Sequence, residues 1–160
     1  MIFSTSRGKS LDVYLEKDCE AVVFSRSGGK IAKIKEEVLE KIPKYKKKYQ
    51  TVHVYFLVGI PDITKRIRRG AYEEFAFIDE DDTLASNIQN QILELSEAVK
   101  IAGCEVCVCT VASMDLEKWN MHRLKGKKTS HLELKDQYKS MQKKMEKAIL
   151  QINKSIASRN

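Results

Sequence analysis

The chain has 160 residues, of which 42% are hydrophobic and 32% are charged, and its formal net charge is +7. This length fits a single domain spanning residues 1–160, and the composition is that of a globular chain and excludes a disordered one. No apolar run approaches the roughly 20 residues of a membrane-spanning helix. The first residues also become polar too soon for a signal peptide. We therefore expect an intracellular protein, cytoplasmic or nuclear, that does not contact a membrane.

Apolar and β-branched runs predict four strands along the chain. They are expected at residues 1–5, 21–25, 52–58 and 105–111. The third run, Val52–Val58, is apolar at almost every position, which is typical of a central strand covered on both faces. It ends at Gly59, and a proline and a carboxylate follow directly. In open α/β sheets, ligands bind outside the carboxyl ends of the strands, so this turn marks a candidate site.

Apolar residues at steps of three and four predict the helices between these strands. Besides a short helix at residues 11–15, we expect a helix from Lys30 that Pro43 ends. A third begins after Thr83, whose hydroxyl is a candidate cap, and Gly103 ends it. The segments 63–83 and 112–130 are predicted to be an irregular excursion and a polar loop.

The alternation of strands and helices predicts an α/β fold. We expect a three-layer αβα architecture of the flavodoxin-like kind, with a mostly parallel sheet of about four to five strands and helices on both faces. The last helix, at about residues 132–158, carries an apolar stripe of Tyr138, Met141, Met145, Ala148, Ile152 and Ile156. This stripe fits a helix packed on the sheet. Its spacing is also close to a heptad, so a homo-oligomer formed through this helix is the alternative.

Three of the four cysteines lie in or beside the fourth predicted strand. Side chains alternate along a strand, so Cys107 and Cys109 share one face while Cys104 points to the other. These three thiols do not converge on one zinc ion. We expect reduced, buried cysteines, and neither a metal nor a cofactor.

The positive charge is clustered in short runs, which favours an anionic partner such as nucleic acid or another polyanion. Such runs are also common on solvated surfaces. The residues predicted to contact nucleic acid are Lys46, Lys47, Lys48, Arg66, Arg68, Arg69, Lys127 and Lys128.

Polar turns follow three of the predicted strands and are expected at one edge of the sheet. They begin at Ser4, Ser25 and Gly59. A serine after the first strand is a candidate nucleophile, and the N–H groups of Gly28 and Gly29 are candidate donors to an oxyanion or a phosphate. The alternative is structural, because strand-to-helix turns in α/β proteins are commonly rich in serine and glycine.

The order of these turns resembles the SGNH (GDSL-type) hydrolases over about residues 1–112. The resemblance implies a serine esterase in which Ser4 or Ser6 is the nucleophile. Gly28 or Gly29 matches the glycine that donates to the oxyanion, and Gly29 is the candidate donor. The turn Gly59-Ile-Pro-Asp62 is similar to the family's Gly-x-Asn-Asp block. Similar domains accompany the coding regions of some retroelements, which implies a mobile-element setting.

Two features depart from that family. Pro61 replaces the asparagine that donates to the oxyanion, and proline has no donor in either its side chain or its backbone. The family's Asp-x-x-His block has no clear match, since His53 lies inside a predicted strand. His122 or His131, in or beside the polar loop, is the candidate substitute for the catalytic base. We expect a degenerate or truncated domain that serves as a basic binding and assembly module, with an active esterase as the alternative.

Overall fold

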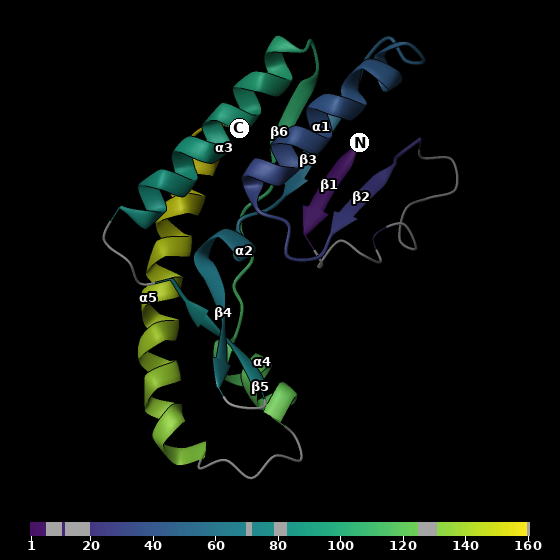
Figure 1. The fold of residues 1–160 in the computed structure, drawn as a ribbon. Coiled ribbons are helices and arrows are strands. Elements are labelled where there is room, and N and C mark those ends of the chain that lie inside the picture. The colour runs from purple at the N-terminus through teal and green to yellow at the C-terminus, as the bar shows by residue number, and fades with distance from the viewer. Residues whose placement is uncertain (6–10, 12–19, 70–71, 79–82, 125–130, 160) are drawn as a thin grey trace.

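The computed structural model describes the chain except for residues 6–10, 12–19, 70–71, 79–82, 125–130 and 160, and the side chains at 69, 72, 122–124 and 131–135 (Figure 1). Its main sheet has four parallel strands in the order β2-β1-β3-β6. These are β1 (Ile2–Thr5), β2 (Val23–Arg26), β3 (His53–Leu57) and β6 (Glu105–Val108). The α/β fold class and the mostly parallel sheet flanked by helices are therefore confirmed.

Two long helices, α1 (Ile31–Lys46) and α3 (Leu84–Ile101), cover the same face of this sheet. The steps from β2 to β3 and from β3 to β6 run in one direction across the sheet, so right-handed crossovers put both helices on one side. Their apolar stripes pack on Val54 and Phe56 of β3. The buried residues of the stripes are Ile31, Ile34, Val38, Ile42, Ala85, Ile88, Ile92, Leu95 and Val99.

The opposite face of β3 is open, so the expectation that residues 52–58 are covered on both faces is wrong. Burial alternates along β3: Val54 and Phe56 are buried, whereas His53 and Tyr55 are exposed. The described helices α1 and α3 lie only on the Phe56 side. The short helix expected at residues 11–15 falls almost wholly outside the described residues.

The segment predicted to be an irregular excursion contains an antiparallel hairpin of β4 (Thr64–Arg69) and β5 (Tyr72–Phe77). The short helix α2 (Ile60–Ile63) leads into it. A further helix, α4 (Leu116–Leu124), lies where a loop was expected, and its Asn120 caps the free edge of β5. The Asn120 amide accepts from the N–H of Phe75 at 2.8 Å and donates to its carbonyl at 2.7 Å. The edge of β5 is thereby covered at Phe75.

Helix α1 does not end at Pro43 but continues for another turn to Lys46. A proline in the last turn removes one backbone hydrogen bond. The end of the helix is held in place by Tyr45, which contacts Phe24 edge-on at 6.2 Å, and by the Lys47 N–H, which donates to the Pro43 carbonyl. Packing here outweighs the helix-breaking tendency of proline. Thr83 is the N-cap residue of α3, but its side chain makes no capping hydrogen bond.

The last helix, α5 (His131–Ala157), lies along α3 and reaches down to the hairpin (Figure 1). The predicted apolar stripe is covered within the chain, since Tyr138, Met145, Ala148, Ile152 and Ile156 are buried. A homo-oligomer formed through α5 stays a prediction. Among the described residues, no helix is long and apolar enough to cross a membrane.

Candidate functional site at the carboxyl edge of the sheet

The three predicted turns meet at one edge of the sheet. Ser4 and Ser25 are register partners on β1 and β2, and their hydroxyl oxygens lie 2.9 Å apart. From the turn after β3, Asp62 reaches the start of α1, where its Oδ1 accepts a hydrogen bond from the Ile31 N–H at 3.1 Å. Parallel strands bring their carboxyl ends together, so this juxtaposition follows from the topology.

The Ser4 side chain is buried, with only 1% exposed, and its hydroxyl is engaged. It donates to the Thr5 carbonyl at 3.0 Å, so Ser25 is the donor in the Ser4–Ser25 pair. A nucleophilic serine needs a base in hydrogen-bond contact. None of the described side chains supplies such a base to Ser4. Ser6, the other candidate nucleophile, lies outside the described residues.

Asp62 serves as the N-terminal cap of α1, because Lys30 at the N-cap position makes no side-chain cap. Asp62 is only 8% exposed, and its Oδ2 is buried without a hydrogen-bond partner. Burial raises the pKa of Asp62 to about 6, against the lowering effects of the Ile31 N–H and of the Lys30 charge. This carboxyl therefore changes charge in the mildly acidic range.

Two N–H donors of the glycine turn before α1 already have acceptors. The Gly29 N–H donates to the Arg26 carbonyl at 3.0 Å, and the Ile31 N–H is taken by Asp62. Gly28 has a φ of 68°, which leaves it in the left-handed region. The oxyanion role predicted for Gly29 thus requires its present hydrogen bond to break.

The turn after β3 is set by Gly59 and Pro61. Gly59 has a φ of 114°, and a Cβ at this position would lie 2.8 Å from the Val111 Cγ2 atom. Its carbonyl accepts from the N–H groups of Asp62 and Ile63, at 3.1 and 3.2 Å. Pro61 sits in the first turn of α2, where its missing N–H costs nothing. This turn places the Asp62 carboxyl beside the first residue of α1.

The predicted histidines do not complete the site within the described residues. His53 lies at the start of β3, at the opposite edge of the sheet, and its Nδ1 is 2.8 Å from the Glu105 carboxylate. His122 belongs to α4 and His131 begins α5, but their side chains are outside the description. Their roles as substitute bases stay predictions.

The predicted basic residues do not form one surface. Lys46, Lys47 and Lys48 lie at the end of α1, whereas Arg66 and Arg68 lie on the hairpin at the far end of the molecule (Figure 1). Arg66 is near Glu73, at 3.8 Å, and over the Phe75 ring. The side chain of Arg69 and the whole of Lys127 and Lys128 are outside the description.

The three described cysteines are free thiols. Burial raises the pKa of Cys104 and that of Cys109, which lowers their reactivity as thiolates. In the described part of the chain, no three His, Cys, Asp or Glu side chains gather closely enough to hold a metal ion.

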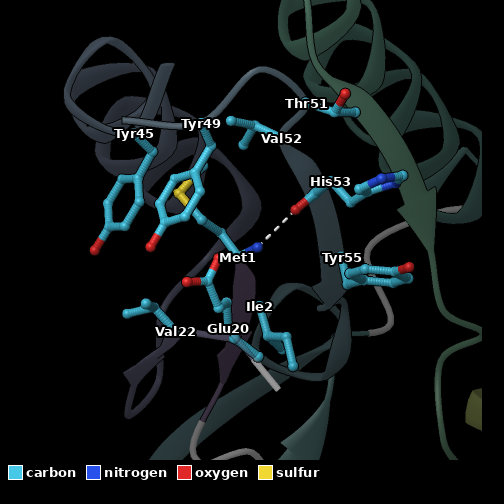
Figure 2. A pocket seen from close by; sticks show the side chains of 11 residues that line it. Met1, Ile2, Glu20, Val22, Tyr45, Tyr49, Thr51, Val52, His53 and Tyr55 are labelled. Carbon is cyan, nitrogen blue, oxygen red and sulfur yellow. Dashed lines mark hydrogen bonds between the residues drawn. The ribbon is translucent and has the colours of Figure 1, made fainter. Parts of the chain in front are cut away.

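Two features were missed by the sequence reasoning. One is the buried pair of Glu74 and Tyr138, in which the Tyr138 hydroxyl donates to the Glu74 carboxylate at 2.5 Å. No sequence signal marks this pair, because Glu74 is one of several charged residues in the hairpin. The other is a cavity of about 490 Å³ at the amino edge of the sheet (Figure 2). The tyrosine inside the basic run Lys44–Lys48 was the available signal, because aromatic and basic residues interleave in nucleic-acid sites.

Comparisons with known proteins give no family for the chain. No protein-family model matches it, and no curated protein matches it either. Among solved structures, a crystal structure of an acetyl xylan esterase matches with a TM-score of 0.42 and 12% identity, over 98% of this chain and 79% of that one. Such a distant likeness carries no argument about activity.

Proposed function

We propose that this chain is a non-catalytic α/β module that binds nucleic acid, or a similar polyanion, through the end of α1. One observation carries the proposal. Lys44, Lys46, Lys47 and Lys48 form no ion pair with any described acidic side chain, and all four are exposed. Elsewhere on α1, Lys33, Lys35 and Lys41 each lie within 4 Å of a glutamate. We refer to Lys44–Lys48 as the α1 basic end.

A binding role suits this geometry better than catalysis does. The Ser4 hydroxyl is buried and donates to a backbone carbonyl, and Pro61 offers no donor to an oxyanion. Exposed lysines without acidic partners, in contrast, attract phosphates and release the counterions around them. The proposal therefore rests on charge, and its signature is salt dependence.

The test compares two triple variants of α1 that carry the same charge change. Lys44→Gln, Lys47→Gln and Lys48→Gln remove the basic end, whereas Lys33→Gln, Lys35→Gln and Lys41→Gln remove lysines that already face glutamates. Lys46 is left in place because its Nζ donates to the Ala102 carbonyl. Log affinity falls linearly with log salt, and we expect the first set to make this slope less steep. Its magnitude should decrease by about 2 for single-stranded and by about 3 for double-stranded nucleic acid.

Fluorescence anisotropy with labelled oligonucleotides at 25 to 200 mM salt gives this slope. The control set is expected to bind within threefold of wild type. Equal slopes for the two variants, or no binding by wild type at the lowest salt, would refute the proposal.

A serine hydrolase is the second candidate, and the meeting of Ser4, Ser25 and Asp62 at one edge favours it. An active enzyme is expected to react with a fluorophosphonate probe, and the label should disappear in either Ser4→Ala or Ser6→Ala. Intact-protein mass spectrometry measures the label. If wild type is not labelled and does not hydrolyse short aryl esters, this candidate is excluded.

A further inference from the structure

The amino-edge cavity lies at the far side of the sheet from Ser4 and Asp62. It is formed where β1, β2 and β3 begin and where α1 ends. Its lining is largely aliphatic and aromatic, with Glu20 as one acidic member. The residues around it are Met1, Ile2, Glu20, Ala21, Val22, Tyr45, Tyr49, Thr51, Val52, His53 and Tyr55 (Figure 2). A cavity of about 490 Å³ is large enough for a flat organic ring.

Three tyrosines supply the aromatic walls of this cavity. Tyr45 and Tyr49 lie side by side on one wall, nearly parallel, with ring centroids 6.5 Å apart (Figure 2). Tyr55 lies on the open face of β3, with its ring turned away from Tyr45 and Tyr49 (Figure 2), and 42% of it is exposed. An exposed aromatic ring on a strand is an available stacking surface for any base, because every base has a flat face.

The α1 basic end meets the cavity at Lys48. Its Nζ lies 4.7 Å from the centre of the Tyr49 ring and donates to the Tyr49 hydroxyl at 2.6 Å. That hydrogen bond, the largest contribution, raises the pKa of Lys48. Lys44 and Lys47 are exposed in the same run. Tyrosine rings in the lining and the positive charge of Lys48 beside Tyr49 match the two halves of a nucleotide, a base and its phosphate.

We propose that the cavity takes one unpaired base of a single-stranded nucleic acid, stacked on Tyr55, while the α1 basic end holds neighbouring phosphates of the same strand. This inference rests on the proposed function and adds a requirement for the base itself. A methylated ammonium group also fits aromatic walls. The four lysines of the basic end outnumber Glu20, however, so the local charge disfavours a cation.

The test uses two oligomers of equal length and charge, one with bases and one with abasic sugars, at one salt concentration. Charge alone predicts equal affinity. A stacked base predicts that the abasic oligomer binds about 5- to 100-fold more weakly. Tyr55→Ala is expected to remove this difference, and Tyr55→Phe to restore it. A single-stranded oligomer bearing 5-iodouracil is expected to cross-link under ultraviolet light to a tyrosine of the cavity.

Trp119→Ala is the matched control, because Trp119 is also an exposed aromatic residue but lies on α4. It is expected to keep the preference for bases. Equal binding of both oligomers by wild type would overturn the base pocket while leaving polyanion binding intact, and no binding to either would overturn both. Displacement by tetramethylammonium chloride, but not by sodium chloride at the same concentration, would assign the cavity to a cation and also overturn this inference.

Discussion

Replacing Gly59 with alanine is expected to lower the free energy of unfolding by about 2 to 6 kcal/mol. A side chain at a φ of 114° is strained, at a cost of roughly 1 to 3 kcal/mol. The added Cβ also lies 2.8 Å from the Val111 Cγ2 atom, and Val111 is buried. Overpacking of this kind costs about 1 to 3 kcal/mol more. Urea denaturation followed by circular dichroism measures the change.

Gly28→Ala is the matched control for this prediction. Gly28 also has a positive φ, of 68°, but a Cβ there would meet nothing within 4 Å. Its alanine variant is expected to lose only the stability that the backbone strain costs, about 1 to 2 kcal/mol. Val111→Ala combined with Gly59→Ala should recover part of the packing cost in a double-mutant cycle. A Gly59→Ala variant no less stable than Gly28→Ala would show that the contact with Val111 is not restrictive.

Asp62→Asn is expected to remove a pH dependence from the stability of the protein. Burial raises the pKa of Asp62 from 3.8 to about 6 in the folded chain. Asp62 therefore stabilises the fold below pH 4, and this contribution is lost as the pH rises through 6. The difference corresponds to roughly 3 kcal/mol. Wild type should gain about that much stability, relative to Asp62→Asn, between pH 7.5 and pH 4.

The control for Asp62 is Asp115→Asn. Asp115 also accepts a hydrogen bond from a backbone N–H, that of Lys118 at 2.8 Å, but it is exposed. Its substitution should leave the pH dependence of stability close to that of wild type. Urea titrations at four pH values between 4 and 7.5 give both curves. A constant difference between wild type and Asp62→Asn at all four values would contradict the raised pKa.

The parallel sheet could be predicted because its strands are short, apolar and separated by amphipathic helices. The hairpin could not, since charged residues occupy both strands: Arg66 faces Phe75, and Arg68 faces Glu73. This hides the alternation that marks a half-buried strand. The open face of β3 was missed for a related reason, because tyrosine and histidine suit an exposed strand face as well as a buried one.

The meeting of the three turns could also be predicted, because topology alone brings the ends of parallel strands together. What each group does there depends on contacts between distant segments. Asp62 caps a helix that begins 31 residues earlier in the chain, and the Ser4 hydroxyl is oriented by the Thr5 carbonyl. The pattern of residue types does not show either contact. It therefore predicted side chains with fewer hydrogen bonds, and a more reactive site, than the structure has.

The Asn153 side chain holds α5 to the end of the main sheet and has a consequence for the order of folding. Its amide accepts from the Val111 N–H at 2.7 Å and donates to the Val111 carbonyl at 2.9 Å. Val111 in turn packs against Gly59. During synthesis the ribosome must add 42 further residues after Val111 before this clamp can close. The turn that carries Asp62 therefore gains its last support only when α5 has emerged.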